Sequence, residues 1–258
     1  MSHPRSACGA LREGGAASGP AEAVPRRPRS FLRRIAVAFA LLAGCAGASA
    51  QVPPSPTETA AYQGLHAAAQ RGDTAGIERL LRAAKNPRPL LEARDGQGRT
   101  PLHVATFARQ REAAKALMAA GADSAAFENG RYDAVTIAAV ADDEETLRVL
   151  LAAGASAKLT TSRYDGTALI AAAHLGHDGV VRQLIAAGAP LDHVNNLHWT
   201  ALIEAVVLGN GGPRHQATVK ALLEAGANTR LTDRDGRTAL QLAQAHGYGA
   251  LVQLLEKR

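Results

Sequence analysis

Cysteine and aromatic residues are scarce in this sequence, and their scarcity excludes several kinds of protein. The 258 residues include two cysteines, Cys8 and Cys45, and both precede residue 51. The chain after residue 50 therefore has neither a disulfide nor a cysteine nucleophile. Aromatic residues make up 3% of the sequence. The few that occur after residue 50 are therefore candidates for contacts with a partner.

A run of roughly 20 apolar residues, which a membrane-spanning helix needs, is missing. The short apolar stretch IAVAFALLA (35–43) follows the basic segment RRPRSFLRR (26–34) and precedes the small residues GCAGASA (44–50). This order predicts a secretory signal peptide over residues 1–50, cleaved after Ala50. LAGC (42–45) also resembles the lipobox of bacterial lipoproteins, in which a lipidated Cys45 becomes the N-terminus. Both alternatives predict export and a periplasmic location.

A basic excess is also missing from the body of the chain. The formal net charge is +6, but seven of the 29 basic and two of the 23 acidic residues lie in residues 1–50. Residues 51–258 thus hold 22 basic and 21 acidic side chains. Nucleic-acid binding needs a concentrated basic surface. We therefore expect no nucleic-acid partner, and membrane contact only through the leader or a lipid anchor.

Motifs for catalysis are absent too. No serine stands in a G-x-S-x-G elbow, and no glycine-rich phosphate loop follows a strand. His174 and His177 could share a metal, and DDEE (142–145) could hold a cation. We favour a simpler explanation: the histidines lie on the surface, and the carboxylates complement the dipole at the start of a helix. We expect no enzyme, no cofactor and no metal site.

Periodicity is the strongest signal that the sequence does contain. Residues 51–61 are rich in proline and predict a short extended tether, and a repeat follows it. The motif TPLHVA begins at Thr100, and weaker copies begin at Asp133, Thr167, Thr200 and Thr238. A Gly-Ala pair recurs in step with them, at Gly121, Gly154, Gly188 and Gly226. Two independent markers thus share one period, and both carry the same surplus in the last interval.

A period of about 33 residues with T-P-L-H-x-A is the signature of ankyrin repeats, and the chain from Tyr62 to its end (62–258) resembles that family. The resemblance implies an all-α solenoid of about six helix-turn-helix units with hairpin loops. Thr100 suits the N-cap of a helix and Pro101 its first position. His103 resembles the family's structural histidine, which hydrogen-bonds near the start of the helix.

The hairpin loops contain the candidate binding residues. Ankyrin repeat proteins generally bind partners with these finger-like loops and the adjoining first helices. Tyr132, Tyr164 and Trp199 fall in the loops, with Arg131 and Arg163 beside the tyrosines. Trp, Tyr and Arg are enriched in binding hot spots, so we predict a partner-binding stripe. Alternatively, each ring packs on the neighbouring hairpin and stiffens the array.

The position after the family histidine is expected to face the same groove. The residues there are Val104, Ile137, Ala171, Glu204 and Leu242. Glu204 is the one charged side chain in this row. It is a candidate to pair with a basic group on the partner or with a local histidine such as His198, and the sequence does not decide between them.

One unit is longer than the others. Thr200 and Gly226 lie further apart along the chain than the corresponding Thr100 and Gly121. The surplus, NGGPRHQ (210–216), places Arg214 and His215 together, and we predict that they form an accessory contact on a rim. The alternative is that the extra residues have no role and the fold tolerates them as slack, since surface insertions cost little closure entropy.

These features predict a protein–protein interaction module of the bacterial cell envelope. It would act as a monomer and bind one protein partner through concave finger loops and first helices. Two alternatives remain: a periplasmic protein that binds a metal or small ligand, and a secreted effector that binds host proteins.

Overall fold

Six helix pairs make up the computed structural model, which describes residues 51–257. Residues 1–50, with the predicted leader and Cys45, lie outside the described residues, as does residue 258. The pairs are α3 (Gly64–Arg71) with α4 (Thr74–Ala83), α6 (Pro101–Phe107) with α7 (Arg111–Ala119), α8 (Ala134–Val140) with α9 (Glu144–Ala152), α10 (Ala168–Leu175) with α11 (Asp178–Ala186), α12 (Ala201–Val207) with α13 (Pro213–Glu224), and α14 (Ala239–His246) with α15 (Gly249–Glu256). The predicted all-α solenoid of six units is confirmed. None of these helices is long and apolar enough to cross a membrane.

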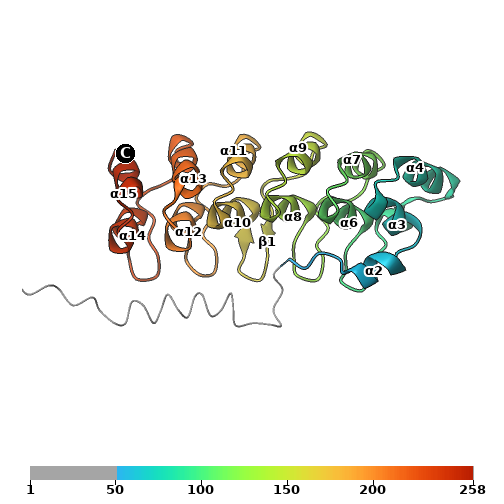
Figure 1. Ribbon diagram of the computed structural model, residues 1–258, viewed down its shortest axis with the longest axis horizontal. Helices are drawn as coiled ribbons and strands as arrows, with labels where there is room; N and C mark the ends of the chain where they lie inside the picture. Colours follow the sequence, from blue (N-terminus) through green and yellow to red (C-terminus); the bar gives the residue numbers. More distant parts are fainter. Residues whose placement is uncertain (1–50, 258) are drawn as a thin grey trace, which may run out of the picture. The chain divides into compact units, whose positions relative to one another are not determined.

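The units stack in one row, with the first helices in one layer and the second helices in another (Figure 1). Hairpin loops, here called fingers, project from the layer of first helices. The five fingers are residues 95–99, 128–132, 161–166, 195–199 and 233–237. The third begins and ends within the two-residue strands β1 (Thr160–Thr161) and β2 (Gly166–Thr167), which pair antiparallel. A single helical turn, α5 (Arg88–Leu91), precedes the first finger.

Side-chain caps begin the first helices of units two to six. The caps are Thr100, Asp133, Thr167, Thr200 and Thr238, and each accepts a hydrogen bond from the backbone N–H three residues later. His103 extends this frame to the next finger, because its Nε2 donates to the carbonyls of Ala126 (3.0 Å) and Tyr132 (3.2 Å). Its Nδ1 accepts from Thr100 N at 3.0 Å. These bonds match the structural role that the resemblance implies.

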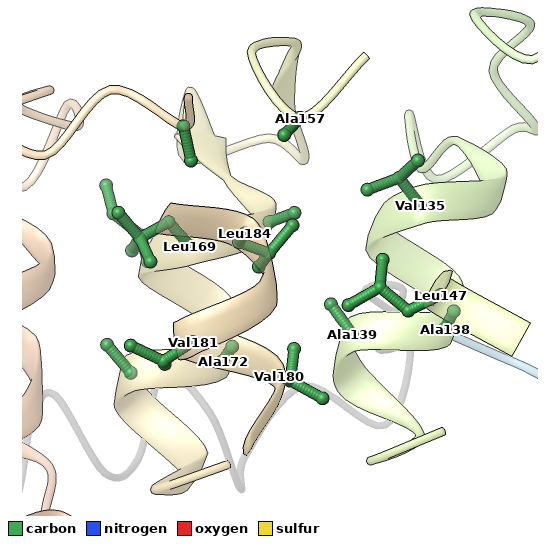
Figure 2. Packing of buried hydrophobic residues seen from close by; sticks show 14 of the residues in the cluster. Val135, Ala138, Ala139, Leu147, Ala157, Leu169, Ala172, Val180, Val181 and Leu184 are labelled. Carbon is green, nitrogen blue, oxygen red and sulfur yellow. The ribbon is translucent and has the colours of Figure 1, made fainter. Parts of the chain in front are cut away.

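Small side chains allow the two helix layers to approach closely. Between units three and four, Ala138, Ala139 and Ala172 are fully buried among larger residues such as Leu147 and Leu184 (Figure 2). Alanine favours the helix and loses no side-chain entropy when it is buried. The same packing continues along the array as one cluster.

The row after the family histidine is largely buried, contrary to our expectation that it faces a groove. Val104, Ile137 and Leu242 are at most 2% exposed, and Glu204 is 5% exposed. Neighbouring first helices pack side by side, and this position falls between them. Ala171 is the one partly exposed member of the row.

The proline-rich segment is not an extended tether, because residues 56–61 form helix α2 (Pro56–Ala61). Ser55 and Glu58 form a capping box, and Pro56 occupies the first helical position, where its missing N–H costs nothing. The segment is also fixed to the first finger. The Arg99 guanidinium pairs with Glu58 and donates to the Val52 carbonyl (3.2 Å). We call residues 51–61 the N-terminal strap.

Candidate protein-binding surface

Each finger is closed by an acceptor at its first position or, in the third finger, its second. Asp95, Glu128, Asn195 and Asp233 each accept hydrogen bonds from the backbone N–H groups two and four residues later. The distances range from 2.8 to 3.1 Å. In the third finger the Ser162 hydroxyl accepts from Tyr164 N at 3.2 Å. The acceptors hold the fingers in a tight turn, as Asx residues do.

Hydrogen bonds between neighbouring fingers join the first four into a continuous edge. Asn129 N donates to Gln97 O (3.0 Å), and Ser162 N donates to Arg131 O (2.9 Å). Asn196 N continues the series to Tyr164 O at 3.0 Å. Backbone bonds of this kind fix each loop against the next, so side chains on the tips are held in place before any partner arrives.

The tips of the central fingers have side chains where the outer fingers have glycine. Two residues before the helix cap the backbone is left-handed in all five fingers, at Gly98, Arg131, Asp165, His198 and Gly236, with φ between 51° and 74°. A left-handed backbone costs a residue with a side chain about 1 kcal/mol, and glycine almost nothing. The three central fingers thus retain Arg131, Asp165 and His198 against a local strain.

Four of the predicted contact residues lie on the second and third fingers. Arg131 and Arg163 are exposed, and Tyr132 and Tyr164 are half-buried. Arg131 Nη1 lies 3.6 Å from Asp165 Oδ1, with both side chains about half exposed. Burial raises the pKa of Tyr132, and the charge of Glu128 raises it further. The structure therefore brings these residues together on one edge.

Trp199 behaves differently from the tyrosines. Its ring is partly buried and packs against the hydrophobic core, as the stiffening alternative expected. The residue before it, His198, is exposed on the tip of the fourth finger. His198 and Asp165 were not among the predicted contact residues. Aligning each finger on its helix cap would have revealed them, because both replace Gly98.

Glu204 is a buried structural acceptor rather than a groove residue. Its Oε1 accepts from Asn195 Nδ2 at 2.8 Å, and its Oε2 lies 3.4 Å from His174 Nδ1. The alternative of a local histidine is correct, although the histidine is His174 and not His198. Because Asn195 closes the fourth finger, Glu204 holds that finger from beneath.

The insertion comprises residues 210–214, and His215 is the counterpart of His177. His177 stands at the same offset before Gly188 as His215 before Gly226, and both rings bond a carbonyl near the end of a preceding first helix. His177 Nδ1 donates to Ala139 O (2.9 Å), and His215 Nε2 donates to His174 O (3.0 Å). His215 is 8% exposed. Its predicted place on an open rim is therefore wrong.

Arg214 lies in the first turn of α13, which is 12 residues long whereas α11 has nine. Its guanidinium bonds Asp142 (2.8 and 3.1 Å), and its Nε lies 3.5 Å from Asp178. The ring of Tyr248 covers the inserted Gly211, where a Cβ would come within 2.6 Å. The insertion is thus packed against neighbouring units. It is not slack.

The residues that the sequence suggested for metal binding, His174, His177 and DDEE (142–145), mostly contact other protein groups. No group of three or more His, Cys, Asp or Glu side chains within residues 51–257 could hold a metal ion. Within DDEE, Asp143 caps α9, Asp142 pairs with Arg214, and Glu145 pairs with Arg111. Contacts between units therefore account for most of this acidic cluster.

Comparison with known proteins defines the family. The family described as "Ankyrin repeats (3 copies)" matches residues 40–128 and 135–227. The ankyrin repeat protein YahD of Escherichia coli (strain K12) is 34% identical over 189 residues, which are 73% of this chain and 92% of YahD. The chain belongs to the ankyrin repeat family.

Solved structures agree with this assignment. An ankyrin repeat domain from Acinetobacter baumannii AYE is 46% identical, with a TM-score of 0.69 over 75% of this chain and 96% of that one. The ankyrin repeat domain of Bcl-3 is 28% identical, with a TM-score of 0.69 over 76% of this chain and 86% of that one. Ankyrin repeat proteins are generally non-enzymatic scaffolds for protein–protein interaction.

Proposed function

We propose that this chain is a monomeric interaction module of the bacterial cell envelope that binds one protein partner through its second, third and fourth fingers. The observation that carries the proposal is the strained backbone at Arg131, Asp165 and His198. Strain of this kind is found at binding sites more often than elsewhere. Glycine at the same place in the outer fingers indicates that the fold itself does not need these side chains.

The first helices contribute less than the sequence suggested. Positions 101–106 of α6 and 201–206 of α12 are buried throughout. The proposed contact therefore uses the fingers and not the buried faces of the first helices. Arg214 and His215 serve the packing of the insertion and are left out of the proposed surface.

A crosslinked pull-down from envelope extract, with the tagged full-length chain as bait, tests the proposal. Arg131→Gly removes one exposed arginine from a left-handed position on a finger (φ 64°). Arg109→Gly is the matched control, because it removes an exposed arginine at φ 56° from the opposite edge of the solenoid. We expect a partner that the control and the native chain capture and that Arg131→Gly loses. Equal capture by both variants contradicts the use of the fingers.

The signal peptide predicted from residues 26–50 supports the envelope location. Fractionation tests it: the chain should be recovered by osmotic shock or with the membranes, and the intact mass should show whether Cys45 carries lipid. Recovery from culture supernatant would favour the secreted effector.

A further inference from the structure

Acidic and basic side chains of the fingers are used in different ways. Asp95, Glu128 and Asp233 close their own loops by accepting backbone N–H groups, and Asp233 is 7% exposed. Within the fingers three arginines are exposed, namely Arg131, Arg163 and Arg234, against one exposed carboxylate, Asp235. These closing carboxylates are buried or half-buried, so the fingers expose more positive than negative charge.

This asymmetry is greatest on the central fingers. Their tips, residues 129–131, 163–165 and 196–198, contain two arginines and one histidine against one carboxylate, Asp165. The fourth finger uses the neutral Asn195 as its closing acceptor instead of an aspartate. The last finger differs, since Arg237 pairs with both Asp233 and Asp235.

The turns between first and second helices form the opposite edge of the solenoid. Several acidic side chains there pair with side chains of neighbouring units. Glu145 pairs with Arg111, and Asp142 pairs with Arg214. Glu144 accepts from Gln183 at 3.3 Å. Carboxylates on this edge thus contact side chains of neighbouring units, whereas Arg131, which lies 3.6 Å from Asp165, and Arg163 are exposed on the finger edge.

We infer that the partner presents clustered carboxylates to Arg131, Arg163 and His198, with Tyr132 and Tyr164 as flanking contacts. The inference deepens the proposed function and rests on it. Arginine binds carboxylates with two parallel hydrogen bonds, and burial of the pair at an interface strengthens them. Nucleic acid fits less well, because proteins that bind it typically neutralise about six or more phosphates.

Trp199 provides the measurement, since it is the one tryptophan of the chain and lies in the fourth finger. The probe is a synthetic peptide of alternating Glu and Ala, titrated into the full-length chain and followed by Trp199 fluorescence and calorimetry. A peptide with Gln in place of Glu is the neutral control, and a single-stranded DNA oligonucleotide supplies phosphates instead of carboxylates.

The acidic peptide should bind at low ionic strength and weaken as salt is added. Arg131→Gln with Arg163→Gln should weaken it roughly threefold or more. Lys115→Gln with Arg148→Gln removes the same charge from exposed positions on the second helices, α7 and α9, and should leave binding unchanged. Thermal melting would confirm that both variants fold.

Three results would overturn the inference: no saturable binding of the acidic peptide, equal binding of the Gln peptide, or equal loss in both double variants. Tighter binding of the oligonucleotide than of the peptide would also overturn it in favour of a phosphate partner. The pull-down separates this inference from the proposed function. If Arg131→Gly loses a partner there and any of these results is also obtained, the fingers bind a partner, but that partner is not recognised by clustered carboxylates.

Discussion

Arg214 bonds both carboxylate oxygens of Asp142, a residue 72 positions earlier in the chain. The same guanidinium lies 3.5 Å from Asp178, so one side chain of the fifth unit contacts acids of the third and fourth. Stacked repeats ordinarily contact their nearest neighbours. The insertion therefore adds a link across three consecutive units.

We expect Arg214→Gln to lower the free energy of unfolding by about 0.5–1 kcal/mol, because Nη2 of Arg214 bonds both oxygens of Asp142 but the arginine is half exposed. Urea denaturation at low and high salt measures this, and the loss should shrink as salt screens the pair. Lys220→Gln is the control: its partner Glu224 lies in the same helix at 3.8 Å, so its loss should be near zero. Equal effects from both variants would contradict a link between units.

The sequence revealed that the insertion exists but not what it does. The spacing of repeat markers locates the extra residues between Gly209 and Gly226, and the shared offset from the Gly-Ala marker identifies His215 with His177. The contact of Arg214 with Asp142 depends on the angle at which three units stack. That angle is set by packing along the whole array, and no local pattern encodes it.

Thr218 is a buried hydroxyl without a hydrogen-bond partner among the described residues. It occupies the place that Val180 has in α11, three residues after the equivalent histidine. Thr218→Val should therefore raise the free energy of unfolding by about 1 kcal/mol, because it removes a desolvated hydroxyl at nearly constant volume.

Thr146→Val is the opposite case at the corresponding position of α9. There the hydroxyl donates to Asp143 Oδ2 at 2.6 Å, and its loss leaves a buried carboxylate with one acceptor unsatisfied. We expect a destabilisation of about 1–2 kcal/mol. Chemical denaturation of both variants gives opposite signs if hydrogen bonding, and not the methyl group, decides the outcome.

His103 makes the fold sensitive to acid. Burial lowers its pKa to about 4 from an ordinary value near 6.5. The neutral ring is favoured in the folded state, so its contribution is complete above pH 6.5 and is lost as the pH falls toward 4. Gln241 fills the same place in the last unit, where it accepts from Thr238 N. His103→Gln should remove up to about 3 kcal/mol of this pH dependence, measured as unfolding midpoints between pH 7 and pH 4.

Asp133 acts with the opposite sign. Burial raises its pKa above the ordinary value, although Thr136 N bonds the carboxylate. A raised pKa means that its contribution is greatest below the unfolded pKa and is lost as the pH rises through the folded one. Threonine caps the other first helices of units two to six, and Asp133→Thr should therefore stabilise the chain more at pH 7 than at pH 4. An equal gain at both values would show that ionisation of Asp133 is irrelevant.

The repeat period and the helix N-caps made most of the fold predictable from the sequence. Thr100 and Pro101, for example, define the start of a helix by local chemistry alone. The binding surface was predictable in part. Arg131 and Tyr132 could be assigned to a finger from the loop position, whereas the burial of Glu204 follows from how neighbouring first helices pack. The proline content of the strap favours an extended tether, whereas the spacing of Ser55 and Glu58 is that of a capping box, which begins a helix.

The strap also offers a test of what Arg99 does. This side chain is 1% exposed and pairs with Asp95 (2.6 Å) as well as with Glu58. Glu58→Ala removes the capping box and one of the two carboxylates, so the strap should detach. We expect faster hydrogen exchange in residues 51–61 and a loss of about 1–2 kcal/mol. Glu78→Ala, which breaks an exposed pair with Arg82 within α4, should cost about 0.3 kcal/mol. Exchange in the strap that is fast already in the native chain would mean that it is a tether after all, and that Arg99 is held by Asp95 alone.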